Sequence, residues 1–160
     1  MSSNPVYIPY KRTGFSHHKC YLRETKGCSD KLSSEHYLSE NILNKIERIN
    51  TTIDVTGLSW LPKERLKSIG KSSLVSNILC TQHNSDLSAL DSIDGELIDG
   101  IACIDAEFNE NDPVAINVSI DGVPFERWII KTVIGLVESN QIRQKSGQPF
   151  VYKKKCLKST

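Results

Sequence analysis

The chain has 160 residues, of which 38% are hydrophobic and 24% charged, and its formal net charge at pH 7 is +1. This composition supports a packed core in one domain, or in a small domain with an extension. No apolar run reaches the ~18 residues of a membrane span, and the N-terminus lacks the basic start and apolar stretch of a secretory signal, so we expect a cytoplasmic protein.

A cysteine loop, a strand and a helix are predicted in the first third of the chain. The polar residues between Cys20 and Cys28 include a glycine, which suits a hairpin-like loop. A strand or turn follows over 32–36. Ser39 is a favoured helix N-cap, and the apolar residues after it repeat at helical spacing, which predicts a helix over 40–49.

The middle of the chain predicts a strand and two further helices. The segment 53–60 is rich in residues that favour strands. Pro62 is well placed to open a short helix over 63–70 that ends at Gly70. Apolar residues lead into Cys80, and others follow it at helical spacing, which predicts another helix there.

The second half of the chain predicts a strand followed by a helix. From 91 to 112 there are eight acidic residues and no basic one. Apolar and polar residues alternate over 114–120, which predicts a strand. Asp121-Gly122 is a tight-turn signal, and the apolar residues of 124–139 repeat at helical spacing, so we predict a strong apolar helix there.

The chain has five cysteines, and in a cytosolic protein clustered thiols are more often metal ligands than disulfides. Cys103 lies in a short apolar string and is expected to be a small buried hydrophobic residue. Cys156 lies in a lysine-rich tail and is expected to be a free thiol. The three cysteines that remain are the candidates for a metal site.

Four residues in two pairs have the chemistry of zinc ligands. Cys80 and His83 have the short spacing of a turn that wraps a metal, and Cys20 and Cys28 can supply the other half. The seven residues between the first two cysteines are more than the usual two to four. A histidine at position 17 or 18 could replace one of them. The alternative is that these cysteines are buried but unrelated.

Glu35-His36 lies between these ligand pairs, and Asn84 directly follows the last ligand. The whole set resembles the HNH endonucleases, which are ββα-metal nucleases on a treble-clef zinc scaffold. Their pattern is a cysteine pair, an acid-His dipeptide and then Cys-x2-Cys-Asn. The resemblance covers roughly 17–93. The chain departs from it in having Glu for the commoner Asp, His83 for a cysteine, and no basic residue three or four positions after Asn84.

The resemblance implies roles for these residues. Cys20, Cys28, Cys80 and His83 would hold a structural Zn²⁺. His36 would be the general base, while Glu35 and Asn84 would hold a catalytic Mg²⁺ or another divalent cation. These three residues are therefore predicted to converge. The alternatives are an ordinary histidine at 36 and an N-cap role for Asn84.

The predicted fold class is α+β, with a zinc-stapled treble-clef ββα-metal core, a helical insertion and a C-terminal strand-helix extension. The core would span 1–93, with the insertion at about 38–75. The extension would span 94–160 and end in a basic tail. Net charge is +5 over 1–80, −10 over 81–140 and +6 over 141–160. The basic parts could contact a polyanion, or the segments could neutralise one another on folding.

These features predict a metal-dependent endonuclease that hydrolyses phosphodiester bonds in DNA, with RNA as a second possible substrate. The acidic stretch would face away from the duplex or bind a regulator. A non-catalytic treble-clef zinc module that binds nucleic acid, a protein partner or a second copy of itself is the main alternative. A zinc-free interaction protein is the third.

Overall fold

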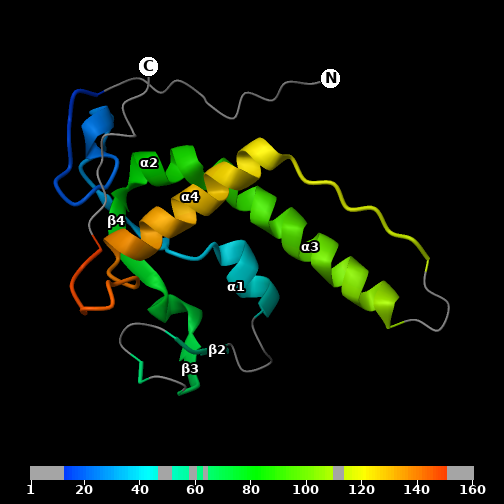
Figure 1. Cartoon of the computed structure of the whole chain (residues 1–160). Helices are drawn as coiled ribbons and strands as arrows, with labels where there is room; N and C mark the ends of the chain where they lie inside the picture. Colours follow the sequence, from blue (N-terminus) through cyan, green and yellow to red (C-terminus); the bar gives the residue numbers. More distant parts are fainter. Residues whose placement is uncertain (1–12, 47–51, 58–60, 63–64, 110–113, 151–160) are drawn as a thin grey trace.

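The structure is a computed structural model, and it describes residues 13–46, 52–57, 61–62, 65–109 and 114–150. Helices and small antiparallel sheets alternate along the chain, so the predicted α+β class is confirmed (Figure 1). The elements in order are η1 (Arg23–Thr25), β1 (Leu32–His36), α1 (Glu40–Ile46), β2 (Thr52–Val55), β3 (Lys67–Gly70), η2 (Lys71–Ser73), β4 (Val75–Cys80), α2 (Thr81–Leu87), η3 (Ser88–Leu90), α3 (Asp91–Phe108) and α4 (Gly122–Glu138).

The central hairpin pairs β1 with β4, although a long stretch of chain lies between them. The strands are antiparallel, with Leu32 opposite Cys80 and His36 opposite Val75. Between Ser33 and Glu35 the register shifts, because the partner strand has one extra residue over that interval. Such a bulge bends the strand and increases its twist. The intervening chain folds as α1 and as a second hairpin, β2–β3, which lies at the far end of the molecule (Figure 1).

Two small apolar clusters hold the fold together, one at each end of the central hairpin. The first contains the three buried cysteines with Tyr21, Ile78 and Leu79. The second is built from the residue after β1, residues of α1, β2 and β3, and the residue before β4: Tyr37, Leu43, Ile53, Ile69 and Leu74. Helix α4 contributes to both, because Ile134 packs on the first cluster and Leu136 on the second. The C-terminal helix therefore covers the central hairpin rather than forming a separate unit.

The predicted N-cap of the first helix is confirmed. The backbone N–H of Asn41 donates to the Ser39 hydroxyl at 3.2 Å, and α1 then runs from Glu40 to Ile46. The side chain of Leu43 is completely buried on the inner face of this helix. The last three residues of the predicted helix lie outside the described part of the chain.

The predicted helix over 63–70 is wrong. Residues 67–70 form β3 instead, which pairs with β2 so that Ile69 lies opposite Ile53. Both isoleucines are buried in the second apolar cluster. A proline and a glycine at the right spacing are weak local signals, and burial of these two side chains across a hairpin outweighs them. Residues 63–64 lie outside the described part of the chain.

The predicted strand over 114–120 is also wrong. This segment pairs with no strand among the described residues, and it runs beside α3 (Figure 1). A Cβ on Gly100 of α3 would approach a methyl carbon of Val118 to 2.5 Å. Val118 therefore lies against a helix rather than in a sheet, while Val114 and Ile116 are exposed.

Asp121-Gly122 does not form the predicted tight turn. The Asp121 carboxylate accepts a hydrogen bond from the Val123 N–H at 3.1 Å, so it caps the first turn of α4. This helix confirms the predicted C-terminal helix. Asp121 is a favoured N-cap residue because its carboxylate satisfies a donor that has no partner inside the helix.

Helix α3 crosses the predicted boundary at 93/94, and its second half projects from the fold (Figure 1). Cys103 lies on this half and is exposed, so its predicted burial is wrong. Its apolar neighbours are exposed too, because no element of the described chain covers that turn of the helix. None of the helices in the described stretches combines the length and apolar character that crossing a bilayer requires.

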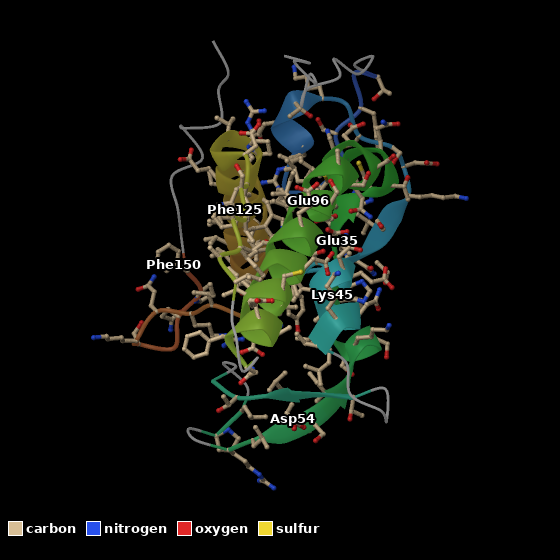
Figure 2. All side chains as sticks on the ribbon, turned by 90° about the vertical axis from the view of Figure 1, so that its right-hand side faces the viewer. Glu35, Lys45, Asp54, Glu96, Phe125 and Phe150 are labelled. Atoms are coloured by element: carbon tan, nitrogen blue, oxygen red, sulfur yellow. The ribbon has the colours of Figure 1, made fainter. Side chains whose placement is uncertain are left out.

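The acidic α3 is partly neutralised within the fold. Lys45 of α1 pairs with Asp99, and the two helices lie side by side in Figure 2. Asp91 pairs with Lys131 of α4. Asp94 is completely buried between these helices. The Lys45–Asp99 contact supports the interpretation that basic and acidic segments neutralise one another, whereas Asp91 and Lys131 belong to the same acidic segment.

Candidate functional site

Three thiols and one imidazole meet at a single buried point. The ligand atoms of Cys20, Cys28, Cys80 and His83 all lie within 4.8 Å of one another, and no side chain of the four is more than 1% exposed. The Nδ1 atom of His83 is 3.3 Å from the Sγ of Cys20, 3.7 Å from that of Cys28 and 3.2 Å from that of Cys80. The predicted ligand set therefore comes together in the fold.

Backbone hydrogen bonds hold the loop that carries the first two cysteines. The Cys20 N–H donates to the His17 carbonyl, and the Cys28 N–H donates to the Phe15 carbonyl. The Tyr21 N–H donates to the Ile78 carbonyl at 3.0 Å, which ties the loop to β4. The loop is thus fixed against the strand that delivers the third cysteine.

Cys80 lies where β4 ends and α2 begins. Its Sγ accepts the N–H of His83 at 3.4 Å, so the sulfur takes the place of an N-cap oxygen. A residue three positions into the first turn lies on the same side of a helix as the cap. This local geometry explains why the Cys80-x2-His83 spacing brings both side chains to one point.

A hydroxyl fixes the orientation of the His83 ring. Thr25 Oγ1 donates to the Leu22 carbonyl at 2.9 Å, and it lies 2.8 Å from His83 Nε2. Because the single hydroxyl proton goes to the carbonyl, the oxygen accepts from Nε2–H. We therefore assign the proton to Nε2, which leaves the Nδ1 lone pair directed at the three thiols. Partners of this kind hold metal-bound histidines in place in other proteins.

The electrostatics of this cluster fit a cation. Burial raises the pKa of Cys20 to about 12 and also raises the pKa of Cys28, while it lowers the pKa of His83. Burial acts in the same upward direction on Cys80, but hydrogen bonds from the backbone of His83 and Ser29 outweigh it, and its pKa is lowered. Without a cation, the buried cluster therefore holds protons on at least two sulfurs.

The donor chemistry matches zinc. Three thiolates and one imidazole are a common set for a closed tetrahedral Zn²⁺ site, with Zn–S distances of about 2.3 Å. The observed separations between ligand atoms allow one such ion at the centre after small side-chain movements. Binding would release the thiol protons, so zinc affinity at this site depends on pH.

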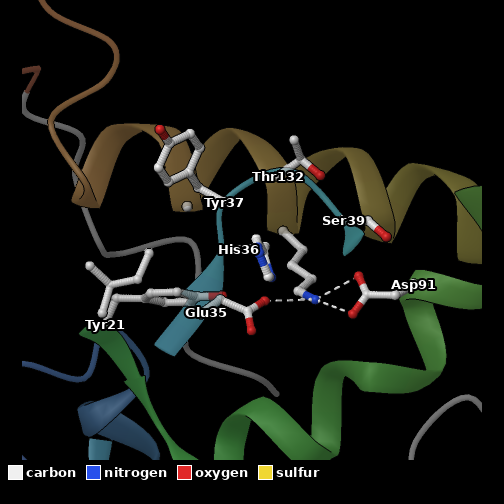
Figure 3. A pocket seen from close by; sticks show the side chains of 10 residues that line it. Tyr21, Glu35, His36, Tyr37, Ser39, Asp91 and Thr132 are labelled. Atoms are coloured by element: carbon white, nitrogen blue, oxygen red, sulfur yellow. Dashed lines mark hydrogen bonds and ion pairs between the residues drawn. The ribbon is translucent and has the colours of Figure 1, made fainter. Parts of the chain in front are cut away.

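A second group of polar side chains lines a pocket at the other end of β1. Glu35 and His36 both contribute to it, although successive residues of a regular strand point to opposite faces. The register shift between β1 and β4 lies directly before this pair, and its extra residue belongs to β4. The full lining, drawn in Figure 3, is Tyr21, Glu35, His36, Tyr37, Ser39, Ile78, Asp91, Lys131, Thr132 and Gly135.

A buried ion triad crosses this pocket. The Lys131 Nζ lies 3.1 Å from a carboxylate oxygen of Glu35, and 2.7 and 2.6 Å from the two carboxylate oxygens of Asp91. The Lys131 side chain is only 8% exposed. Burial raises the pKa of Glu35, even though the adjacent ammonium favours its charged form. The three groups together carry one net negative charge when both carboxyls are ionised.

Asn84 lies on α2, apart from the residues that line this pocket. Its side-chain amide donates to the Ser33 hydroxyl at 2.8 Å, two residues before Glu35 on β1. It is inside the helix rather than at its start, so the alternative N-cap role is wrong. Glu35 and His36 are thus together, and convergence of Asn84 with them stays a prediction.

Lys131 is a member of this site that the sequence did not predict. The signal for Lys131 was a lone charge inside the apolar run of α4, because a lysine buried in a helix face needs acidic partners. Nothing local distinguishes Asp91 from the other acidic residues of its stretch. Only the packing of α3 and α4 against β1 identifies it.

Comparisons with protein-family models, with curated proteins and with solved structures found no match to this chain.

Proposed function

We propose that this chain is a zinc-stabilised, metal-dependent endonuclease of the HNH type, which hydrolyses phosphodiester bonds in DNA. The observation that carries the proposal is that one hairpin bears two kinds of site. Strand β4 ends in the thiol and imidazole cluster at Cys80, while β1 ends in Glu35 and His36 within one pocket. A structural metal and a neighbouring acid-histidine pair are what the sequence resemblance implies.

In this proposal the zinc ion links the knuckle, the hairpin and the helix of a treble clef. The loop 20–28 would be the zinc knuckle, β1 and β4 the hairpin, and α2 the helix that carries the second ligand pair. Structural zinc contributes directly to folding because the site does not exist in the unfolded chain. The zinc would therefore fix the hairpin that carries Glu35 and His36, without taking part in the reaction.

His36 is the proposed general base. It is partly exposed at the pocket, where a water molecule can reach its ring. A neutral imidazole can accept a proton from that water near neutral pH while the water attacks phosphorus. Glu35 would help to hold Mg²⁺, whose chemistry is to stabilise the negative charge that develops on the phosphate. Asn84 remains the amide ligand implied by the resemblance.

Basic side chains near the zinc cluster fit a nucleic-acid substrate. Lys19, Lys26 and Lys31 are exposed on or beside the loop that carries the first two cysteines. Lysines in such a position contact phosphates without reading sequence. DNA binding that depends on these residues should weaken as salt is raised, because phosphate contacts release counterions.

Nicking of supercoiled plasmid, with and without Mg²⁺, tests the proposal. The parent protein should nick DNA only with the divalent cation, and His36→Ala should lose ~10²–10⁴-fold in rate. Zinc content and circular dichroism should not change in this variant. His18→Ala, which removes an exposed histidine that does not line the pocket, is the matched control and should nick at the parental rate. Equal rates for His36→Ala and the parent would refute the nuclease proposal.

A second candidate, a non-catalytic zinc module that binds nucleic acid or a protein, is favoured by one observation. The Glu35 carboxylate is bonded to the Lys131 ammonium, so in this conformation it is not free to bind a metal. This candidate predicts that plasmid stays intact with any divalent cation, while a gel-shift assay still detects salt-sensitive DNA binding or a pull-down detects a protein.

A further inference from the structure

The pocket lined by Glu35, Asp91 and Lys131, here called the acidic pocket, holds a positive charge where two carboxylates from different elements meet. Glu35 reaches it from β1 and Asp91 from α3, and the ion pairs are dashed in Figure 3. The charge is the ammonium of Lys131, delivered by α4, with its side chain 8% exposed. The pocket therefore already binds a cation, and that cation is tethered to the protein.

The positions of the carboxylates suit a divalent metal ion with little rearrangement. Both carboxylates bond to the same nitrogen, at 3.1 Å for Glu35 and at 2.6 and 2.7 Å for Asp91. Mg²⁺ binds carboxylate oxygens at ~2.1 Å, usually through one or two carboxylates with water completing its shell. Each carboxylate would need to move inward by only about 1 Å or less to reach a metal ion at the same point.

A divalent ion neutralises the two carboxylates, which one ammonium cannot do. Two carboxylates and one ammonium leave one net negative charge, which repels a phosphate. With a divalent ion in place of the ammonium, the two carboxylates are neutralised. The displaced ammonium of Lys131 then requires an anionic partner, which a phosphate bound beside the metal ion would supply.

We propose that Glu35 and Asp91 form a divalent-cation site, and that Lys131 occupies this site until a metal ion displaces it. The use of that cation in DNA cleavage rests on the proposed nuclease function, but its binding does not. Asp91 thereby supplies the second oxygen ligand from α3, while the Asn84 amide stays bonded to Ser33.

Titration of the zinc-loaded full-length protein with Mn²⁺, followed by the EPR signal of the free ion, tests the proposal. Removing the competing ammonium in Lys131→Met should tighten Mn²⁺ binding at least about tenfold. Lys45→Met is the matched control, because Lys45 pairs with the exposed carboxylate of Asp99 on the surface. It should leave Mn²⁺ affinity unchanged. No gain in Lys131→Met, or an equal gain in the control, would overturn the proposal.

Lys131→Met leaves the buried carboxylate of Glu35 and the partly exposed one of Asp91 without their partner, which is destabilising. If this variant is unfolded in metal-free buffer, Mn²⁺ should restore its fold, and failure to do so would overturn the proposal. Asp91→Asn should bind Mn²⁺ at least about tenfold more weakly than the parent. Combined with Lys131→Met, it should cancel the gain in affinity that Lys131→Met gives alone.

The outcomes separate this proposal from the nuclease function. Mn²⁺ binding that depends on Asp91, in a protein that never nicks DNA, would keep the cation site and refute the nuclease. Nicking that survives Asp91→Asn but is lost in Asn84→Ala would keep the nuclease and refute the pairing of Glu35 with Asp91.

Discussion

Thr25 and His83 are 58 residues apart in sequence, and a 2.8 Å contact between the Thr25 hydroxyl and His83 Nε2 sets which ring nitrogen faces the three thiols. The hydroxyl is itself oriented by the Leu22 carbonyl within the cysteine loop. The loop thus contributes two thiols to the cluster and also prepares the imidazole for metal binding. A residue that hydrogen-bonds to a metal ligand can in this way affect metal affinity nearly as much as the ligand itself.

Thr25→Val should weaken zinc binding about 10–100-fold, because the His83 ring loses the acceptor that fixes its tautomer. The measurement is competition for zinc with a chromophoric chelator. Thr25→Ser keeps the hydroxyl and should restore most of the affinity. If Thr25→Val binds zinc as tightly as the parent, the hydrogen bond does not position the ligand.

Cys80→Ser should lose the bound zinc and most of the folded structure, since metal-binding energy at such a site is folding energy. Elemental analysis of protein purified without added metal and far-UV circular dichroism measure the two effects. Cys103→Ser changes an exposed thiol on α3 and should keep about one zinc per chain. A parent protein that is folded and free of zinc would contradict the metal site.

Asp94→Asn should stabilise the protein more at pH 7 than at about pH 3.8, the ordinary pKa of this group. Burial raises the pKa of Asp94 above its ordinary value of 3.8, and both carboxylate oxygens are buried without a hydrogen-bond partner among the described residues. Ser39 and Trp128 lie close enough to favour the charged form, but neither meets hydrogen-bond geometry. As pH rises past 3.8, the unfolded chain loses this proton first, so native stability falls until the folded carboxyl also ionises.

Urea unfolding of Asp94→Asn and the parent at both pH values measures this effect. The amide removes the buried charge, so the gain at pH 7 should be on the order of 1–3 kcal/mol. Asp99→Asn alters an exposed acid on the same helix and should show no such pH-dependent gain. A difference between Asp94→Asn and the parent that shrinks as pH rises would contradict the raised pKa.

Gly100→Ala should affect the free energy of unfolding differently in the parent and in Val118→Ala. In a helix interior, alanine is more favourable than glycine by about 1 kcal/mol. In the parent the new Cβ would meet a methyl of Val118 at 2.5 Å, and the displacement of 114–120 should cancel or reverse the gain. In Val118→Ala the gain should appear in full.

A double-mutant cycle by thermal or urea unfolding measures this coupling between α3 and segment 114–120. Additive effects of the two substitutions would mean that the segment does not pack on Gly100 in solution.

The sequence determined the features that depend on neighbouring residues or on residue chemistry. Cysteine and histidine are selective zinc-type ligands, so the cluster was identifiable without a structure. Ser39 and the apolar periodicity of 124–139 predicted the start of α1 and the body of α4, because caps and helical faces are local properties. Cys103 is exposed, and 114–120 belongs to neither sheet of the described residues. Both predictions failed because an apolar pattern does not indicate which element its side chains contact.

Only the tertiary structure decided the composition of the acidic pocket. Glu35 and His36 line one pocket although they are successive residues of a strand, and the pocket exists only because distant elements pack around them. Lys131 and Asp91 join them because α4 and α3 pack against that hairpin, which no local pattern encodes. Burial then changes the chemistry of these side chains, because a charge withdrawn from water requires a partner that the fold alone can bring to it.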